Sequence, residues 1–302
     1  MSQFKYTFII PHKNSPELLQ RCIDSIPERE NVQIIIVDDN SSKEIVNRQK
    51  FPGLGRKHTE VYFTEDGKGA GYARNVGLAH AKGQWLLFAD ADDYYAPGFL
   101  DVLDKELEDN REILFFNVFS NVEGINNRAK TINEDYETFI KTKDINIIKY
   151  KNWPPWNKVF SKKFIDDNKL SFEEIPVGND AMFSLNASLL SKNISVINDQ
   201  LYCITNQPQS ITFTRMNYER RMAYLRINIR INKFLKKINL SKYQLLITTP
   251  DAIQQIYKEK GFKTVLNYLI YIHKEYSIAE SIYLWIQTKF KILQIKLHHL
   301  FS

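Results

Sequence analysis

The chain has 302 residues, 43% hydrophobic and 25% charged, so disordered and collagen-like classes are excluded and one large domain, with or without an appendage, is expected. Its two cysteines, Cys22 and Cys203, are far apart and form no CxxC pair, which argues against a structural zinc site and a disulfide-stapled secreted fold. We find no signal-peptide core and no run of about 20 apolar residues, and therefore expect a cytoplasmic protein without a membrane span.

The net charge of +6 is unevenly distributed along the chain. Residues 215–302 contain 16 Lys and Arg against 5 Asp and Glu, a net charge of +11, and residues 1–214 have a net charge of −5. This asymmetry predicts a domain boundary near residue 214 and two parts with different electrostatic partners.

Short apolar runs and helical segments alternate over the first 120 residues. Strands are predicted at 6–10, 34–37, 61–63 and 85–88, and helices at about 16–27, 42–50 and 71–82. The alternation predicts a mostly parallel sheet with right-handed crossovers. Such sheets bind ligands beyond the carboxyl ends of their strands.

Polar residues follow three of these strands at the point where each strand ends. The first strand leads into residues 11–14 (PHKN), the second into 38–41 (DDNS) and the fourth into 90–93 (DADD). We expect these groups to meet on one rim of the sheet. Carboxylates at the end of a buried strand are costly unless they are neutralised, and Mg²⁺ or Mn²⁺ bridging to a phosphorylated ligand would do so. The simpler alternative for 90–93 is an Asp-rich turn.

A glycine-rich segment, residues 67–75 (GKGAGYARN), lies between the third and fourth strands. It lacks the Gly-Lys-Ser/Thr ending of a P-loop and the spacing of a dinucleotide fingerprint, and it does not directly follow a strand. It is either a flexible loop leading into a helix or a helix entry whose Arg74 contacts a diphosphate.

In this order the motifs resemble those of the family 2 glycosyltransferases with the GT-A fold, the nucleotide-diphospho-sugar transferases of bacterial polysaccharide assembly. The resemblance is strong over about 4–120 and weaker at 156–160, 178–183 and 210–212. It implies an α/β fold with a mostly parallel central sheet flanked by helices. The catalytic domain would cover 1–214, with a donor half over about 1–120 and an acceptor half over about 121–214, followed by a helical C-terminal region.

The resemblance also implies roles for the matching residues. Asp180 would be the catalytic base and Asp92, with Asp93, would hold Mn²⁺ or Mg²⁺. The donor-binding residues would be Pro11, Asp38, Asp39, Arg74, Asp90 and Ala91. For Asp38 and Asp180 a capping acid is the alternative.

The chain departs from the family pattern at two positions. Asn179 stands where the family usually has Glu, and Thr205 lies where it often has an arginine. Lys158 or Arg215 would replace that arginine, or the product nucleotide would leave faster.

The function implied is inverting transfer of a sugar from a nucleotide-diphospho-sugar to a glycan or lipid-linked acceptor. Among such donors we expect a UDP-sugar. The metal would offset charge on the leaving diphosphate, and one carboxylate would take the proton of the acceptor hydroxyl. Two rivals stay open. Asn179 favours a non-catalytic nucleotide-sugar-binding protein, and a nucleotidyltransferase would need a glycine-rich loop after the first strand, where residues 11–16 contain no glycine.

The acceptor site is expected at Trp153, Trp156 and Asn179. The two tryptophans are candidates because aromatic planes suit the apolar faces of sugar rings. A core position is the alternative for Trp156.

Beyond residue 217, helices are predicted at 218–238, about 250–260, 262–273 and 278–300, the last with an apolar stripe flanked by lysines. This region either packs on the catalytic domain or binds an anionic membrane, which would make the protein peripheral at the inner face of the membrane. It contains no recognisable nucleic-acid module, so no nucleic-acid partner is expected.

Overall fold

The computed structural model describes residues 4–121, 128–205, 216–277, 279, 280, 282 and 286. The chain divides into two compact units, Met1–Phe213 and Thr214–Ser302. Each unit has its own apolar core within its described residues.

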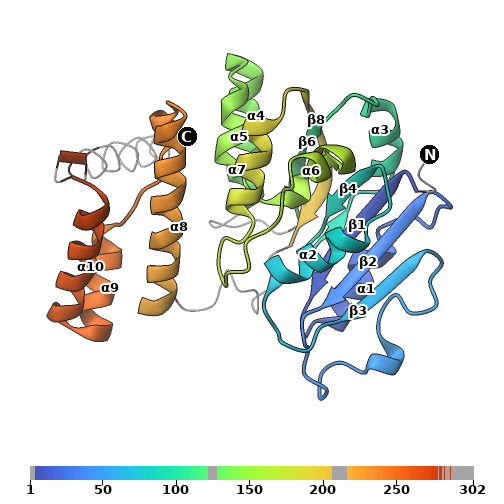
Figure 1. Ribbon diagram of the computed structural model, residues 1–302, viewed down its shortest axis with the longest axis horizontal. Helices are drawn as coiled ribbons and strands as arrows, with labels where there is room; N and C mark the ends of the chain where they lie inside the picture. The colour runs from blue at the N-terminus through green and yellow to red at the C-terminus, as the bar shows by residue number, and fades with distance from the viewer. Residues whose placement is uncertain are drawn as a thin grey trace. The chain divides into compact units, whose positions relative to one another are not determined.

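The first unit is built on a mixed sheet of the strand order β3-β2-β1-β4-β7-β6-β8-β5. The strands are β1 (Tyr6–His12), β2 (Val32–Asp38), β3 (Thr59–Phe63), β4 (Trp85–Phe88), β5 (Tyr94–Tyr95), β6 (Ile113–Ser120), β7 (Lys158–Ser161) and β8 (Ile194–Ile204). Strands β1 to β4 are parallel to one another, whereas β7 runs antiparallel to both β4 and β6. Strand β8 pairs in parallel with β6, beside which it lies in Figure 1, and antiparallel with β5.

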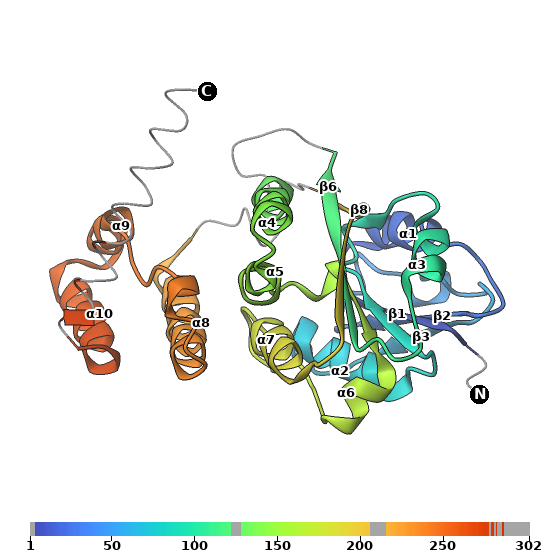
Figure 2. The ribbon, with the colours of Figure 1, turned by 90° about the horizontal axis from the view of Figure 1, so that it is seen from above.

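Helices cover both faces of this sheet. They are α1 (Pro16–Asp24), α2 (Ala70–His80), α3 (Phe99–Glu106), α4 (Arg128–Thr142), α5 (Ile145–Lys151), α6 (Lys162–Asp167) and α7 (Ala181–Leu190). Helices α1 and α3 lie on one face of the parallel strands, and α2 and α6 lie on the other (Figure 2). Because both faces are covered, β1, β2 and β4 are buried along their whole length, as expected for the run of β-branched residues in β2.

The four strands predicted in the first 90 residues are confirmed, and three of them, β1, β2 and β3, extend beyond their predicted bounds. Strand β1 continues through Pro11 to His12, beyond the predicted end at residue 10. Its pairing with β4 ends at Ile9, while its pairing with β2 continues to His12. Proline has no N–H to donate, and because β1 no longer pairs with β4 at Pro11, the sheet loses no hydrogen bond there.

The helix predicted at 42–50 is wrong. Residues 48–50 form only a short 3₁₀ turn, because Asn47 has extended backbone angles and its side chain accepts a bond from the Gln49 N–H. Such a local side-chain bond competes with continuation of a helix.

The second unit contains the three helices predicted before residue 277. These are α8 (Tyr218–Lys237), α9 (Pro250–Lys260) and α10 (Phe262–Glu275), and they share a core that includes Leu225, Ile256 and Tyr268. The helix predicted at 278–300 lies almost wholly outside the described residues. Over the part that the structure covers, no helix combines the length and apolarity needed to cross a bilayer.

Candidate active site at the carboxyl edge of the sheet

Strands β1, β2 and β4 end at the same edge of the sheet because they run in parallel. The polar segments predicted to converge, residues 11–14, 38–41 and 90–93, lie at or just beyond these strand ends, so they do lie at one edge. Pro11 and Ala91 are buried there, one inside β1 and the other between the acidic residues after β4.

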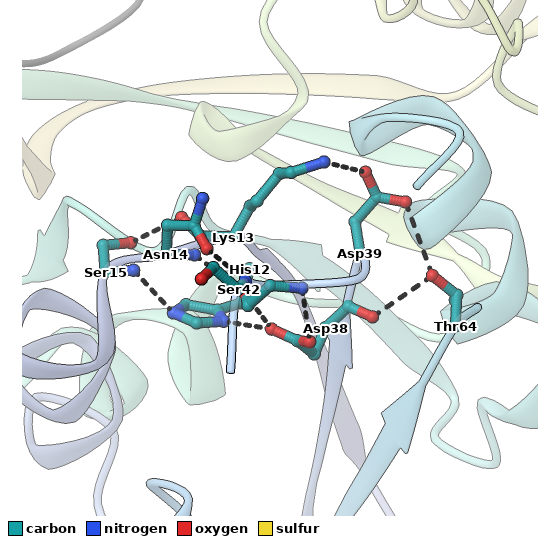
Figure 3. Close-up of polar contacts among 9 residues, drawn as sticks. His12, Lys13, Asn14, Ser15, Asp38, Asp39, Ser42 and Thr64 are labelled. Carbon is teal, nitrogen blue, oxygen red and sulfur yellow. Dashed lines mark hydrogen bonds and ion pairs between the residues drawn. The ribbon is translucent and has the colours of Figure 1, made fainter. Parts of the chain in front are cut away.

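Asp38 ties the loop after β1 to the loop after β2. Its carboxylate accepts hydrogen bonds from His12 Nδ1 at 2.7 Å, from the Ser41 N–H at 3.0 Å and from Ser41 Oγ at 2.5 Å (Figure 3). The Ser15 N–H donates to His12 Nε2 at 3.1 Å, so the ring proton is on Nδ1. Burial raises the pKa of Asp38, but these bonds outweigh it and hold the pKa below its usual value. These contacts are those of a turn-capping acid.

Asp39 lies beside Asp38 and contacts the start of α2. The Gly69 N–H donates to Asp39 Oδ2 at 2.8 Å. Lys13 Nζ lies 3.6 Å from the same oxygen (Figure 3). The side chain of Asp39 is 4% exposed, whereas that of Lys13 is 50% exposed. A buried acceptor thus lies next to an accessible cation at the end of β2.

Asp90, Asp92 and Asp93 form an acidic cluster after β4, with one carboxylate oxygen of each within 4.8 Å of the others. Burial and the charge of Asp90 raise the pKa of Asp92 to about 6. Burial and both neighbours raise the pKa of Asp93 well above its ordinary value, although the Thr205 N–H donates to Asp93 Oδ1 at 2.7 Å. A set of oxygen ligands that repel one another fits a hard divalent cation such as Mg²⁺ or Mn²⁺.

Two residues hold the carbonyl group of Asp92 in place. Thr205 Oγ1 donates to the Asp92 carbonyl oxygen at 2.5 Å, and Arg21 Nη2, from α1, donates to the same oxygen. Thr205, near which the family resemblance implies an arginine, is thus bonded to the acidic cluster. Arg21 was missed by the sequence reasoning, since nothing local marks a helix residue whose partner lies 71 positions away.

Arg74 links the acidic cluster to the segment before α7. Its Nη2 donates to Asp90 Oδ1 at 2.6 Å and its Nη1 donates to Asn179 Oδ1 at 2.8 Å. The side chain of Arg74 is only 6% exposed. Of the predicted donor residues, Arg74 and Asp90 are therefore paired with each other.

Asp180 occupies the N-cap position of α7, yet its side chain makes no capping hydrogen bond. The capping alternative is therefore not supported. Burial raises the pKa of Asp180, opposed by the charges of Arg74 and Arg128 and reinforced by Asp90. A carboxylate with a raised pKa is a stronger proton acceptor. Arg128, the first residue of α4, was not anticipated, and its guanidinium lies 5.6 Å from the Trp156 ring centre.

The predicted acceptor residues differ in their surroundings. Trp156 is 2% exposed and stacks on Tyr202 at 5.3 Å, so its ring belongs to the core and leaves no face for a sugar. Trp153 is half-buried, and its Nε1 donates to the Tyr150 carbonyl oxygen at 2.8 Å.

Lys158 does not replace the family's arginine. It is fully buried in β7, and its ammonium donates to the Pro154 carbonyl oxygen at 2.6 Å and to Asn157 Oδ1 at 2.9 Å. Burial lowers the pKa of Lys158 to about 7. Arg215 and residues 210–212 lie outside the described residues.

Comparison with known proteins supports the interpretation of the motifs. A family model described as Glycosyl transferase family 2 matches residues 7–170. The chain is 30% identical over 212 residues to the poly(ribitol-phosphate) beta-glucosyltransferase of Bacillus spizizenii, covering 66% of this chain and 32% of the relative. It spans about a third of the length of several curated relatives that it matches.

Solved structures share the fold. The S. aureus TarS 1-349 protein in complex with UDP-GlcNAc matches with a TM-score of 0.61 and 20% identity, over 84% of this chain and 73% of that chain. A mannosyltransferase from Pyrobaculum calidifontis in complex with GDP-Man and Mn²⁺ matches with a TM-score of 0.52 and 13% identity, over 95% and 80%. At these identities the likeness concerns the fold alone, and it confirms the predicted fold class.

Proposed function

Since the chain belongs to glycosyl transferase family 2, we propose that it transfers a sugar from a nucleotide-diphospho-sugar, a UDP-sugar, to a hydroxyl of a glycan or lipid-linked acceptor in surface polysaccharide synthesis. The observation that carries this proposal is the acidic cluster of Asp90, Asp92 and Asp93 at the same sheet edge as Asp39. The names of the relatives, one a poly(ribitol-phosphate) transferase and one a protein solved with UDP-GlcNAc, support the substrate class.

In this proposal Asp39 accepts a hydrogen bond from the nucleotide base, and Asp38 positions it by holding the two strand-end loops together. Pro11 lines the floor of the base site through its backbone. Asp92 would hold Mn²⁺ or Mg²⁺ with help from Asp90, whose side chain is 32% exposed, whereas Asp93 is more deeply buried. The ion, when bound, offsets the negative charge that develops on the leaving diphosphate.

Asp180 acts as the general base. It takes the proton of the acceptor hydroxyl as that oxygen bonds to the anomeric carbon and the bond from that carbon to the diphosphate oxygen breaks. A single displacement of this kind inverts the anomeric centre, and it needs no second carboxylate as a nucleophile. Burial favours this role because it raises the pKa of Asp180.

We assign catalysis to residues 1–214 and propose that residues 215–302 contact an anionic membrane surface. The net charge of +11 in this region supports the assignment. Two exposed aromatic residues, Tyr257 at 57% and Phe262 at 69%, lie in sequence among Lys258, Lys260 and Lys263 where α9 meets α10. Aromatic and basic side chains together are typical of membrane-surface segments.

The proposal is tested by a thermal-shift screen of nucleotide-sugars with Mn²⁺, followed by hydrolysis of the best donor with and without a chelator. We expect one donor to raise the melting temperature and to be hydrolysed only when metal is present. Asn179 favours the second candidate, a binding protein without catalysis. Stabilisation by a nucleotide-sugar without any hydrolysis or transfer would favour that candidate instead.

A further inference from the structure

We propose that helix α2 positions the catalytic segment 172–180, and that the glycine-rich motif at 67–75 serves this packing and does not cradle the diphosphate. The inference rests on the proposed function for the role of Asp180. It departs from the expectation that Arg74 contacts the donor, because every contact of the motif described below is made to other parts of the chain.

The start of α2 is already engaged by the protein. Gly69, at the N-cap position with φ of 94°, donates its N–H to Asp39 Oδ2 at 2.8 Å. A phosphate bound at the Gly69 N–H would compete with this carboxylate for the same donor, and the two anions would repel each other. The N-terminus of α2 therefore fixes Asp39.

The first two turns of α2 hold the segment 172–180 by its backbone. Asn75 Nδ2 donates to the Phe172 carbonyl oxygen at 2.9 Å, and the Phe172 N–H donates to Asn75 Oδ1 at 2.8 Å. This reciprocal pair uses both polar atoms of the amide side chain, so Asn75 fits the backbone of one residue as a strand partner would.

Gly71 allows the helix and this segment to approach closely. A Cβ atom at Gly71 would lie 2.1 Å from the Glu173 carbonyl oxygen and 2.9 Å from Asn179 Cβ. The nearer atom is backbone, so a larger residue cannot be accommodated by a side-chain rotation. Glycine is thus required here for contact between α2 and both ends of the segment.

Arg74 completes the contact from the same helix. Its guanidinium bonds to Asp90 and to Asn179, and lies 5.4 Å from the Phe172 ring centre. Asn179 directly precedes Asp180 in the chain. Arg74 therefore sets the acidic cluster and the catalytic base at a fixed separation, and we assign it as a positioning residue. Asn179 accepts the bond from Arg74 through its amide oxygen.

The test compares two glycine substitutions in the same helix. Gly71→Ala places a methyl group against the Glu173 backbone, whereas in Gly77→Ala the methyl group meets the Ile9 side chain, 2.4 Å away in β1. Hydrogen exchange over 172–180, calorimetry with UDP and Mn²⁺, and hydrolysis of a UDP-sugar are measured for the full chain. For Gly71→Ala we expect exchange over 172–180 to rise at least about fivefold and hydrolysis to fall at least about tenfold, with the Kd for UDP changed less than about twofold.

For Gly77→Ala we expect a lower melting temperature without faster exchange over 172–180. Asn75→Ala removes both bonds to Phe172 without adding atoms, so it tests the same contact if Gly71→Ala does not fold. Weaker UDP binding with unchanged exchange over 172–180 in Gly71→Ala or Asn75→Ala would overturn the proposal. It would show that the motif belongs to the donor site. If the wild-type protein hydrolyses no UDP-sugar, the proposed function fails, while the exchange data still decide whether α2 holds the segment.

A double substitution tests Arg74. If Arg74 and Asn179 act through one bond, Arg74→Gln combined with Asn179→Ala should lower hydrolysis no more than about twofold beyond Arg74→Gln alone. Losses that multiply in full would show that the two residues act independently and would overturn the assignment of Arg74 as a link to the catalytic segment.

Discussion

Asp92 contributes its side chain to the acidic cluster and its backbone to the fold. The bonds from Arg21 and Thr205 go to its carbonyl oxygen and do not involve the carboxylate. We therefore predict that Asp92→Ala folds but loses metal-dependent transfer. Because burial and the charge of Asp90 raise the pKa of Asp92, the melting temperature should stay the same or rise. Turnover with Mn²⁺ near that of the wild type would contradict the metal assignment.

Asp180 is buried but makes no capping bond, so its substitution should affect chemistry more than folding. We predict that Asp180→Asn lowers donor hydrolysis at least about a hundredfold, the usual size of general-base loss. The Kd for UDP with Mn²⁺, measured by calorimetry, should hardly change. If the variant instead loses UDP binding, Asp180 belongs to the donor site.

Lys158 makes the stability of the protein depend on pH. Burial lowers the pKa of Lys158 to about 7, whereas an unfolded lysine titrates near about 10.4. Between these values the unfolded chain binds more protons, so the free energy of unfolding rises with pH over this range. Below about pH 7 both states carry the charge, and the buried ammonium contributes its full destabilisation.

The matching variant is Lys158→Met, which keeps an unbranched chain without the charge. We predict that its advantage in free energy of unfolding over the wild type is largest near pH 6 and shrinks as the pH rises towards 9. Urea denaturation at both pH values measures the difference. An advantage that does not change with pH would mean that Lys158 keeps its charge in the folded protein throughout this range.

The loops after β1 and β2 act as one unit because His12 bridges them. The ring receives a bond from the Ser15 N–H at the start of α1 and donates to Asp38 at the end of β2. We predict that His12→Ala lowers the free energy of unfolding by about 1–3 kcal/mol, since it leaves a buried acceptor without one of its donors. Urea denaturation tests this, and His12→Asn should retain part of the stability. A change within error for His12→Ala would show that Ser41 alone satisfies Asp38.

Elements with a clear local pattern could be predicted from the sequence. The four parallel strands are apolar and short, and the polar residues at their ends follow from strand direction, which is why Asp39 and the acidic cluster could be assigned to one edge. Two strands on the other side of the sheet have weaker patterns. Strand β5 has two residues, and β7 begins with Lys158, whose full burial contradicts its polar character.

The contacts that organise the site were not predictable because they join residues far apart in the sequence. Arg74 and Asn179 are separated by 105 positions, and Asn75 and Phe172 by 97. The motif around Gly71 could be recognised as a pattern, but its partner could not, since only tertiary packing brings the segment 172–180 against α2. The same reason explains why Arg21 was missed.

The two compact units of the chain differ in charge, and this difference bears on where a lipid-linked acceptor would be met. Each lysine or arginine near an anionic bilayer contributes on the order of 1 kcal/mol, and exposed aromatic residues add apolar burial. We predict that Tyr257→Ser combined with Phe262→Ser weakens binding of the full chain to anionic vesicles at least about tenfold. Wild-type binding should fade as salt rises, because screening weakens charge attraction.

Leu54→Ser is the matched control for this prediction, since Leu54 is 49% exposed but lies in the acidic first unit. It should leave vesicle binding unchanged. Co-sedimentation with vesicles is measured beside a thermal melt for all variants. If the exposed aromatic residues instead pack against protein, the double variant should lower the melting temperature and leave vesicle binding unchanged, because removing a packed ring destabilises the fold without affecting a membrane contact. That outcome would contradict the proposal that the residues where α9 meets α10 contact a membrane. The positive charge of the second unit would then require another anionic partner.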